Sequence, residues 1–171
     1  MPSPLVHSGV AAGIALGAGA TSRREWAAIV FAGSLPDLDL VFRFFDADGM
    51  RYHHGPTHSL VGAVLLGWVA ARAFRARAWP CVLACVAHLP LDWTTGVVDA
   101  PPEFGIELWW PFSTVRLLDP SPFFGAYHLD QPGFLWNLWS ADALPILGRE
   151  LGVTALSVAL VYPVVHSFSG T

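Results

Sequence analysis

The strongest restriction on the fold of this chain is a series of apolar stretches separated by short polar turns. Each stretch could form a helix, and together they predict an all-α bundle of about five helices. Gly9, Gly13 and Gly17 recur every fourth residue in the first stretch, and small residues at this spacing let helices approach closely in a membrane. The five stretches are Pro4 to Ala20, about Trp26 to Leu35, Ser59 to Phe74, Trp79 to about Val98, and Leu151 to Val165.

The low share of charged residues indicates a membrane-embedded bundle. The chain of 171 residues is 54% hydrophobic and 13% charged, whereas soluble domains are about a quarter charged. A compact soluble protein with unusually buried helices is the alternative. The stretches are short beside the roughly 20 residues that a straight span requires, so partial insertion or a thinned bilayer also stays open.

The segment from about residue 97 to 148 differs in composition from the rest. It holds half of the 14 prolines and many aromatic residues, among them Trp109, Trp110, Phe112, Trp136 and Trp139. Proline at this density excludes one long helix. We predict a Pro/aromatic-rich cap on a single domain spanning residues 1–171, with the aromatics either at the membrane interface or packed on the helices.

Charge and cysteine content exclude two classes of protein. The net charge is −4, no lysine is present and no arginine-rich tail occurs, so no nucleic-acid binding is expected. Cys81 and Cys85 lie four residues apart in one predicted helix, where a disulfide has poor geometry. A fold that is held together by disulfide bonds is therefore excluded as well.

Histidines and aspartates gather at the ends of the apolar stretches. His88 and Asp92 share one helix face at i, i+4 and can reach one ion, although a simple His-Asp hydrogen bond is the alternative. If successive helices run antiparallel, four groups lie on the same side of the bundle. These are His7; Asp37 with Asp39; His53, His54 and His58; and His88 with Asp92. Imidazole and carboxylate ligands gathered in this way predict a divalent metal site.

Arginines favour the opposite side of this bundle. Arg23 and Arg24 follow the first stretch, and Arg72, Arg75 and Arg77 follow the third. Because positive loops stay in the cytoplasm, we predict a multi-pass protein whose metal site faces the non-cytoplasmic side.

The motifs in this order resemble the YdjM-like family of inner-membrane-associated, metal-dependent hydrolases. The matching segments are residues 1–7, residues 35–39, His53-His54-Gly55-Pro56-Thr57-His58-Ser59, His88-x-x-x-Asp92 and residues 110–113. That family is in turn distantly similar to zinc phospholipase C and P1 nuclease. The resemblance implies one or two divalent ions, zinc first among them, with His7, Asp37, His58, His88 and Asp92 as ligands.

The chain departs from these relatives at two places. The family usually has arginine where His54 stands, so an arginine that binds phosphate would come from elsewhere, with Arg43, Arg51 and Arg116 as the candidates. The distant enzymes also carry a second His-x-x-x-Asp pair, which is absent here because His128 and Asp130 are too close in sequence.

We therefore expect a membrane-bound hydrolase of a phosphoester, whose substrate is a lipid or lipid-linked molecule. A metal-activated water would attack the substrate, and Asp39 or His53 would orient that water or shuttle a proton. The alternative is a non-catalytic membrane protein with a structural metal and a partner-binding aromatic cap. A transporter is disfavoured because the ionisable residues lie at helix ends rather than at mid-helix.

Overall fold

The protein is described by a computed structural model that covers residues 4–45, 53–96, 104–125 and 144–169. The predicted all-α fold is confirmed over these ranges, and only one pair of two-residue strands interrupts it. The α-helices are α1 (Pro4–Gly17), α2 (Arg23–Gly33), α3 (Leu60–Phe74), α4 (Ala78–Trp93) and α6 (Leu144–Ser169). The 3-10 helices are η1 (Pro36–Phe44) and η3 (Pro56–His58), and strand β1 (Thr95–Gly96) pairs in parallel with β2 (Phe124–Gly125).

Local chemistry explains where α2 and α3 begin and end. Ser22 caps α2 by accepting a hydrogen bond from the Glu25 amide at 3.2 Å. Ser59 caps α3 by accepting one from the Gly62 amide at 2.9 Å. The α3 helix ends at Arg75, which has the left-handed backbone conformation that satisfies the last carbonyls.

Small residues let the first four helices pack backbone to backbone. A Cβ atom added at Gly67 of α3 would lie 2.5 Å from Cα of Val82 and 2.8 Å from the carbonyl oxygen of Cys81, both in α4. Contact this close excludes any larger residue at position 67 unless the two helices separate. The buried core is correspondingly rich in alanine, with Ala11, Ala15, Ala28, Ala32, Ala63, Ala70, Ala71 and Ala84.

The glycine face of α1 packs against α6, as the spacing of the glycines indicates. A Cβ atom at Gly13 would lie 3.0 Å from Cγ2 of Val158, and one at Gly9 would overlap the side chain of Thr154. This close approach is the small-residue packing common between membrane helices.

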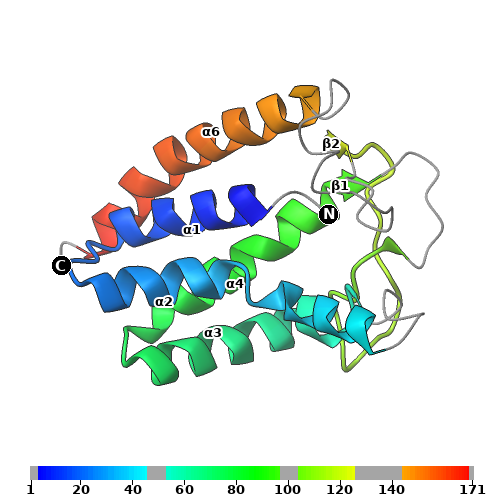
Figure 1. Cartoon of the computed structure of the whole chain (residues 1–171), viewed down its shortest axis with the longest axis horizontal. Coiled ribbons are helices and arrows are strands. Elements are labelled where there is room, and N and C mark those ends of the chain that lie inside the picture. Colours follow the sequence, from blue (N-terminus) through cyan, green and yellow to red (C-terminus); the bar gives the residue numbers. More distant parts are fainter. Residues whose placement is uncertain (1–3, 46–52, 97–103, 126–143, 170–171) are drawn as a thin grey trace.

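The helices lie side by side, and their ends form two chemically different sides (Figure 1). The start of α1, the end of α2, the start of α3 and the end of α4 all lie on one side. The opposite side holds the turn between α3 and α4, where Arg77 donates to Glu25 Oε1 at 2.6 Å and to the Ala18 carbonyl at 2.8 Å. The antiparallel order on which the sequence analysis depends is therefore present.

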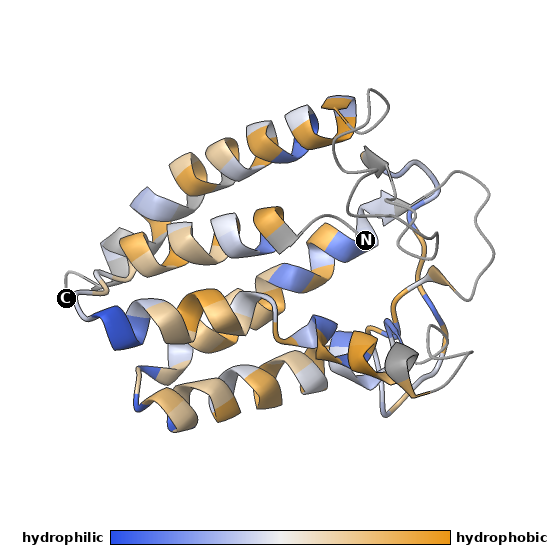
Figure 2. Ribbon diagram, in the orientation of Figure 1, coloured by the Kyte–Doolittle hydropathy of each residue, from blue (hydrophilic) through white to orange (hydrophobic). Residues whose placement is uncertain are grey.

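The helices consist largely of apolar residues, as the hydropathy colouring of the ribbon shows (Figure 2). In the described part of the chain, α6 is the one helix long and apolar enough to cross a membrane, over Leu144–Val164. The other α-helices have 14, 11, 15 and 16 residues, so several full spans stay a prediction, as does a single domain over the whole chain.

Of the predicted cap, residues 144–148 already belong to α6, and residues 104–125 form no α-helix. Ile106 and Leu117 pair there through two backbone hydrogen bonds of 3.0 and 2.9 Å. The rest of the cap sequence, residues 97–103 and 126–143 with Trp136, Trp139, His128 and Asp130, lies outside the described residues.

Candidate metal centre

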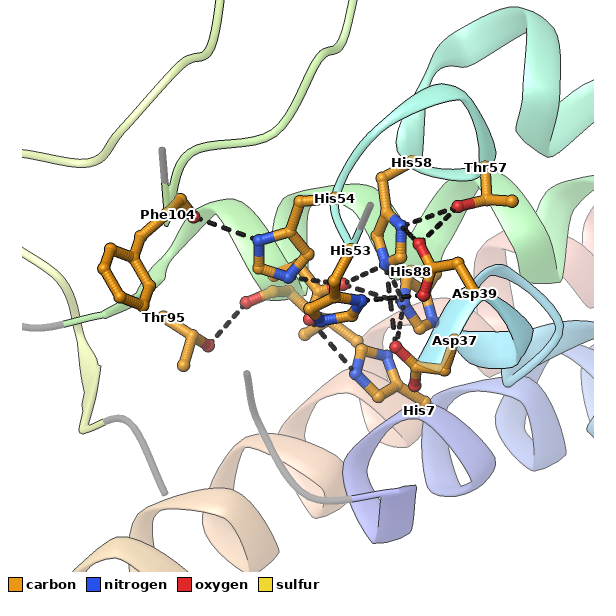
Figure 3. A network of polar contacts seen from close by, with 12 residues as sticks. His7, Asp37, Asp39, His53, His54, Thr57, His58, His88, Thr95 and Phe104 are labelled. Carbon is orange, nitrogen blue, oxygen red and sulfur yellow. Dashed lines mark hydrogen bonds and ion pairs between the residues drawn. The ribbon is translucent and has the colours of Figure 1, made fainter. Parts of the chain in front are cut away.

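The predicted histidines and aspartates meet at one side of the bundle (Figure 3). They come from four segments that are far apart in sequence, and all but Asp37 are buried. Helix α1 supplies His7, η1 supplies Asp37 and Asp39, the segment leading into and including η3 supplies His53, His54 and His58, and α4 supplies His88 and Asp92.

Four of these residues form the inner group of the centre. One ligand atom from each of Asp37, His58, His88 and Asp92 can be chosen so that all lie within 4.8 Å of one another. Nε2 of His88 lies 2.8 Å and Nε2 of His58 lies 2.9 Å from the same Oδ2 of Asp92. The same two nitrogens lie 3.4 and 3.6 Å from Oδ1 of Asp37.

The two histidines of this group lie within hydrogen-bond distance of each other, with their Nε2 atoms 3.3 Å apart, but their short distances to the carboxylates lack hydrogen-bond geometry. Neither oxygen of Asp92, nor Oδ1 of Asp37, has a hydrogen-bond partner among the described residues, although all three atoms are buried. A buried polar atom without a partner costs about 1–3 kcal/mol. Lone pairs that converge on one place at this cost fit a bound cation, and imidazole with carboxylate suits a divalent metal ion such as zinc.

Helix α2 fixes which nitrogen of His88 faces the centre. The Nδ1 atom of His88 donates to the Gly33 carbonyl at 2.7 Å, which leaves Nε2 as a lone-pair donor. The absence of a side chain at Gly33 lets the end of α2 approach α1, because a Cβ atom at this position would lie 2.6 Å from Cβ of Ala11 and 3.1 Å from the His7 carbonyl oxygen. The end of α2 can therefore lie against α1 close to His7.

Asp39 contacts two histidines, His53 and His58, at their Nδ1 atoms. Its Oδ1 accepts from Nδ1 of His53 at 2.7 Å, and its Oδ2 lies 3.2 Å from Nδ1 of His58. Thr57 donates to the same Oδ2 at 2.6 Å, so Thr57 orients Asp39, whereas Ser59 caps α3. Carboxylates in this position orient ligating histidines and raise their basicity.

His7 and His54 lie on two sides of the inner group. The His7 ring stacks on His88 with centroids 3.7 Å apart, and its Nε2 is 3.4 Å from Oδ1 of Asp92. Nε2 of His54 lies 3.9 Å from Oδ2 of Asp92. His54 is not among the ligands predicted from the sequence, although its place inside the His53–His58 motif is a signal for such a role.

The carboxylates make the centre strongly attractive to positive charge. Burial disfavours the charged forms of Asp37, Asp39 and His58. The close approach of His58 and His88 nevertheless lowers the pKa of Asp37, and the interactions with His53 and His58 lower the pKa of Asp39. The nearby carboxylates of Asp37, Asp39 and Asp92 likewise outweigh burial at His58 and hold its pKa well above the usual range.

Zinc affinity is therefore expected to increase with pH. His58 is protonated below its raised pKa in the metal-free protein, and a metal ion must displace that proton to bind Nε2. Each displaced proton changes the apparent affinity by about tenfold per pH unit below the pKa. Competition with a chromophoric chelator between about pH 6 and about pH 8 measures this slope. An affinity that stays constant after correction for the chelator's own protonation would contradict it.

The cysteines of α4 belong to the core and not to the centre. Cys81 and Cys85 are both free and buried, as the exclusion of a disulfide predicts. The thiol of Cys85 donates to the Ala32 carbonyl at 3.0 Å.

Comparison with known proteins identifies one family. The family model described as YdjM inner membrane protein matches residues 3–169. No curated protein and no solved structure matches the chain.

Proposed function

The chain belongs to the YdjM inner membrane protein family, and from this membership and the buried centre we propose that it is a membrane-bound, metal-dependent hydrolase. The observation that supports this most directly is the set of buried carboxylate and imidazole atoms that converge without hydrogen-bond partners. Asp37, His58, His88 and Asp92 are the proposed ligands, with His7 beside them. A divalent ion held by these residues would act as a Lewis acid and would favour the deprotonation of water at neutral pH.

Asp39 and His53 are the proposed partners of the attacking water. Because Nδ1 of His53 donates to Asp39, its Nε2 carries the lone pair, and this atom is buried without a hydrogen-bond partner in the described structure. An imidazole held in one tautomer by a carboxylate is a suitable general base. Asp39 acts through His53 and His58 and is a positioning residue.

The proposed substrate is a phosphoester carried by a lipid or a lipid-linked molecule. A cavity of about 320 Å³ lies next to Asp39 and Thr57 and is bordered by Arg116. The Arg116 side chain is paired with Glu107 at 3.1 Å and donates to the His53 carbonyl at 3.4 Å, so its positive charge lies at the edge of this cavity, where it would favour a phosphate anion.

An apolar groove supports the lipid part of this substrate. The groove has a volume of about 370 Å³, and only apolar residues line it, including Leu83, Val86 and Trp93 of α4 and Ile106 and Leu117 of the cap. It adjoins the helix that carries His88 and Asp92, so an acyl chain in the groove would keep its head group near the centre.

Membrane insertion is proposed to involve α6 together with the apolar faces of the shorter helices. Only 6% of the Leu144–Val164 window is buried within the protein. Helix α3 also exposes Leu65, Trp68 and Val69, each by more than half of its surface. Apolar surface of this extent is unfavourable in water and fits a lipid environment.

Replacing Asp39 by asparagine tests the catalytic part of the proposal. At saturating zinc, the variant should keep its metal content but hydrolyse phosphoesters about 10²–10⁴-fold more slowly, because His53 loses the carboxylate that orients it. Release of nitrophenolate from aryl phosphomonoesters and phosphodiesters, and of the head group from short-chain phospholipids, measures the rate. Asp119→Asn in the cap is the matched control, and equal rates in both variants would exclude this role for Asp39.

A structural metal with a partner-binding cap is the second candidate function. Aromatic residues of the described cap are strongly exposed, with Phe112 at 87%, and exposed aromatics often anchor protein partners. If loss of the metal unfolds the bundle, this structural role is favoured over catalysis.

A further inference from the structure

His54 is buried and rigidly held, but the proposed single-ion centre gives it no task. Its backbone has φ of 65°, an uncommon conformation for a residue other than glycine. Its carbonyl accepts from the Glu107 amide at 2.9 Å, and Nδ1 of its ring lies 3.0 Å from the Phe104 carbonyl. Residues in such uncommon conformations often occur at functional sites.

These contacts determine the protonation of the His54 ring. A carbonyl oxygen only accepts, so Nδ1 of His54 carries the proton and Nε2 carries the lone pair. Figure 3 shows His54 between Phe104 and the rest of the polar network.

The free lone pair of His54 faces another electron-rich atom. Nε2 of His54 has no hydrogen-bond partner within the described residues, and its nearest ionic contact is Oδ2 of Asp92 at 3.9 Å. Two acceptors that face each other in a buried place repel unless a donor or a cation lies between them.

His53 presents a second lone pair of the same kind. Its Nδ1 is bound to Asp39, its Nε2 has no partner in the described structure, and its ring centroid lies 3.9 Å from that of His54. One ring nitrogen from each of His53, His54 and His58 can be chosen so that the three atoms lie within 4.8 Å of one another. Two ligands on one zinc ion lie at most about 4.2 Å apart, which a small rotation of the side chains would achieve.

We propose that His53 and His54 hold a second divalent metal ion, with the Asp92 carboxylate shared between this ion and the one in the inner group. Nε2 of His58 belongs to the inner group, where it lies 2.9 Å from Oδ2 of Asp92, so His58 borders the second site. Two imidazoles and one shared carboxylate leave a coordination position open, which is typical of catalytic rather than structural zinc. The second ion should bind more weakly than the first, because fewer protein groups hold it.

The second ion would change the role of His53. In the single-ion form Nε2 of His53 can accept a proton, whereas in the two-ion form its lone pair binds the metal. This proposal depends on the inner metal group of the proposed function, but not on hydrolysis.

Zinc titration of the full chain tests the proposal. Protein purified in detergent without a polyhistidine tag is stripped with chelator, titrated calorimetrically with zinc and analysed for metal after gel filtration. We expect two equivalents in the wild type and one in His54→Asn. Asparagine tolerates positive φ but is too short to reach the ion, so the backbone is kept while the ligand is lost.

Each outcome has a separate meaning. One equivalent in the wild type at saturation, or two in His54→Asn, would overturn the second site while leaving the first intact. No bound zinc in the wild type would overturn the inner centre as well. Loading with cobalt gives an independent measurement, because two ions that share a carboxylate should show magnetic coupling, and His54→Asn should lose it. The Asp119→Asn variant should match the wild type in both measurements.

Discussion

Replacing His88 and Asp92 together by alanine should abolish metal binding and hydrolysis while the helices stay assembled. Asp92 is buried, and its Oδ2 lies within 3 Å of the Nε2 atoms of both His58 and His88. Loss of both residues removes one imidazole and the central carboxylate, and zinc affinity should fall by more than the roughly 100-fold effect of losing an outer-shell partner. Phosphoester hydrolysis should then fall to the rate without enzyme.

This experiment needs a measure of folding beside the measure of activity. Elemental analysis gives the metal content, and circular dichroism with gel filtration in detergent shows whether the bundle persists. Asp119→Asn is again the control, since Asp119 lies in the cap, where its side chain accepts from the Ser121 amide. Full hydrolytic activity in the double variant would contradict the hydrolase proposal. An unfolded variant would favour a structural role of the metal ion over a catalytic one.

Replacing Gly67 by leucine should have the largest effect on stability. Any Cβ at this position overlaps backbone atoms of Val82 and Cys81, so α3 and α4 must separate to admit a side chain. Overpacking costs about 1–3 kcal/mol where side chains can adjust, and more where backbone stands in the way. The variant should lose about 3 kcal/mol or more and unfold at a clearly lower temperature in detergent.

Gly148→Leu is the matched control, because no atom lies within 4 Å of a Cβ built at Gly148 on α6. It adds the same side chain to a helical glycine and should leave the unfolding temperature unchanged or slightly raised, since leucine favours helix. If Gly67→Leu were as stable as this control, the close contact between α3 and α4 would be wrong.

The helices and the side of the bundle that carries the centre were predictable from sequence. Apolar length and turn residues locate helices without knowledge of their neighbours, and the stretch predicted from Ser59 to Phe74 forms α3 with Ser59 as its cap. The pairing of His88 with Asp92 follows from helical spacing alone. Their place at the end of α4 agrees with Pro90, which lies in the last turn of that helix.

The detailed roles around the centre could not be predicted, because they depend on contacts between distant segments. The Gly33 carbonyl that orients His88 lies 55 residues away in sequence, and the Phe104 carbonyl that orients His54 lies 50 residues away. Thr57 resembles a helix cap in sequence, and only the position of η1 shows that it binds Asp39 instead. Local patterns identify the residue types, while the chain topology decides which nitrogen of each histidine faces inward.

The wide spacing of the centre along the chain has a consequence for biogenesis. The inner group takes Asp37 from η1, His58 from η3, and His88 and Asp92 from the end of α4. A nascent chain that has not yet released α4 from the ribosome lacks half of this group. The complete group can therefore bind a metal ion only after η1, η3 and α4 have come together, and a bound ion would show that these three segments are correctly assembled.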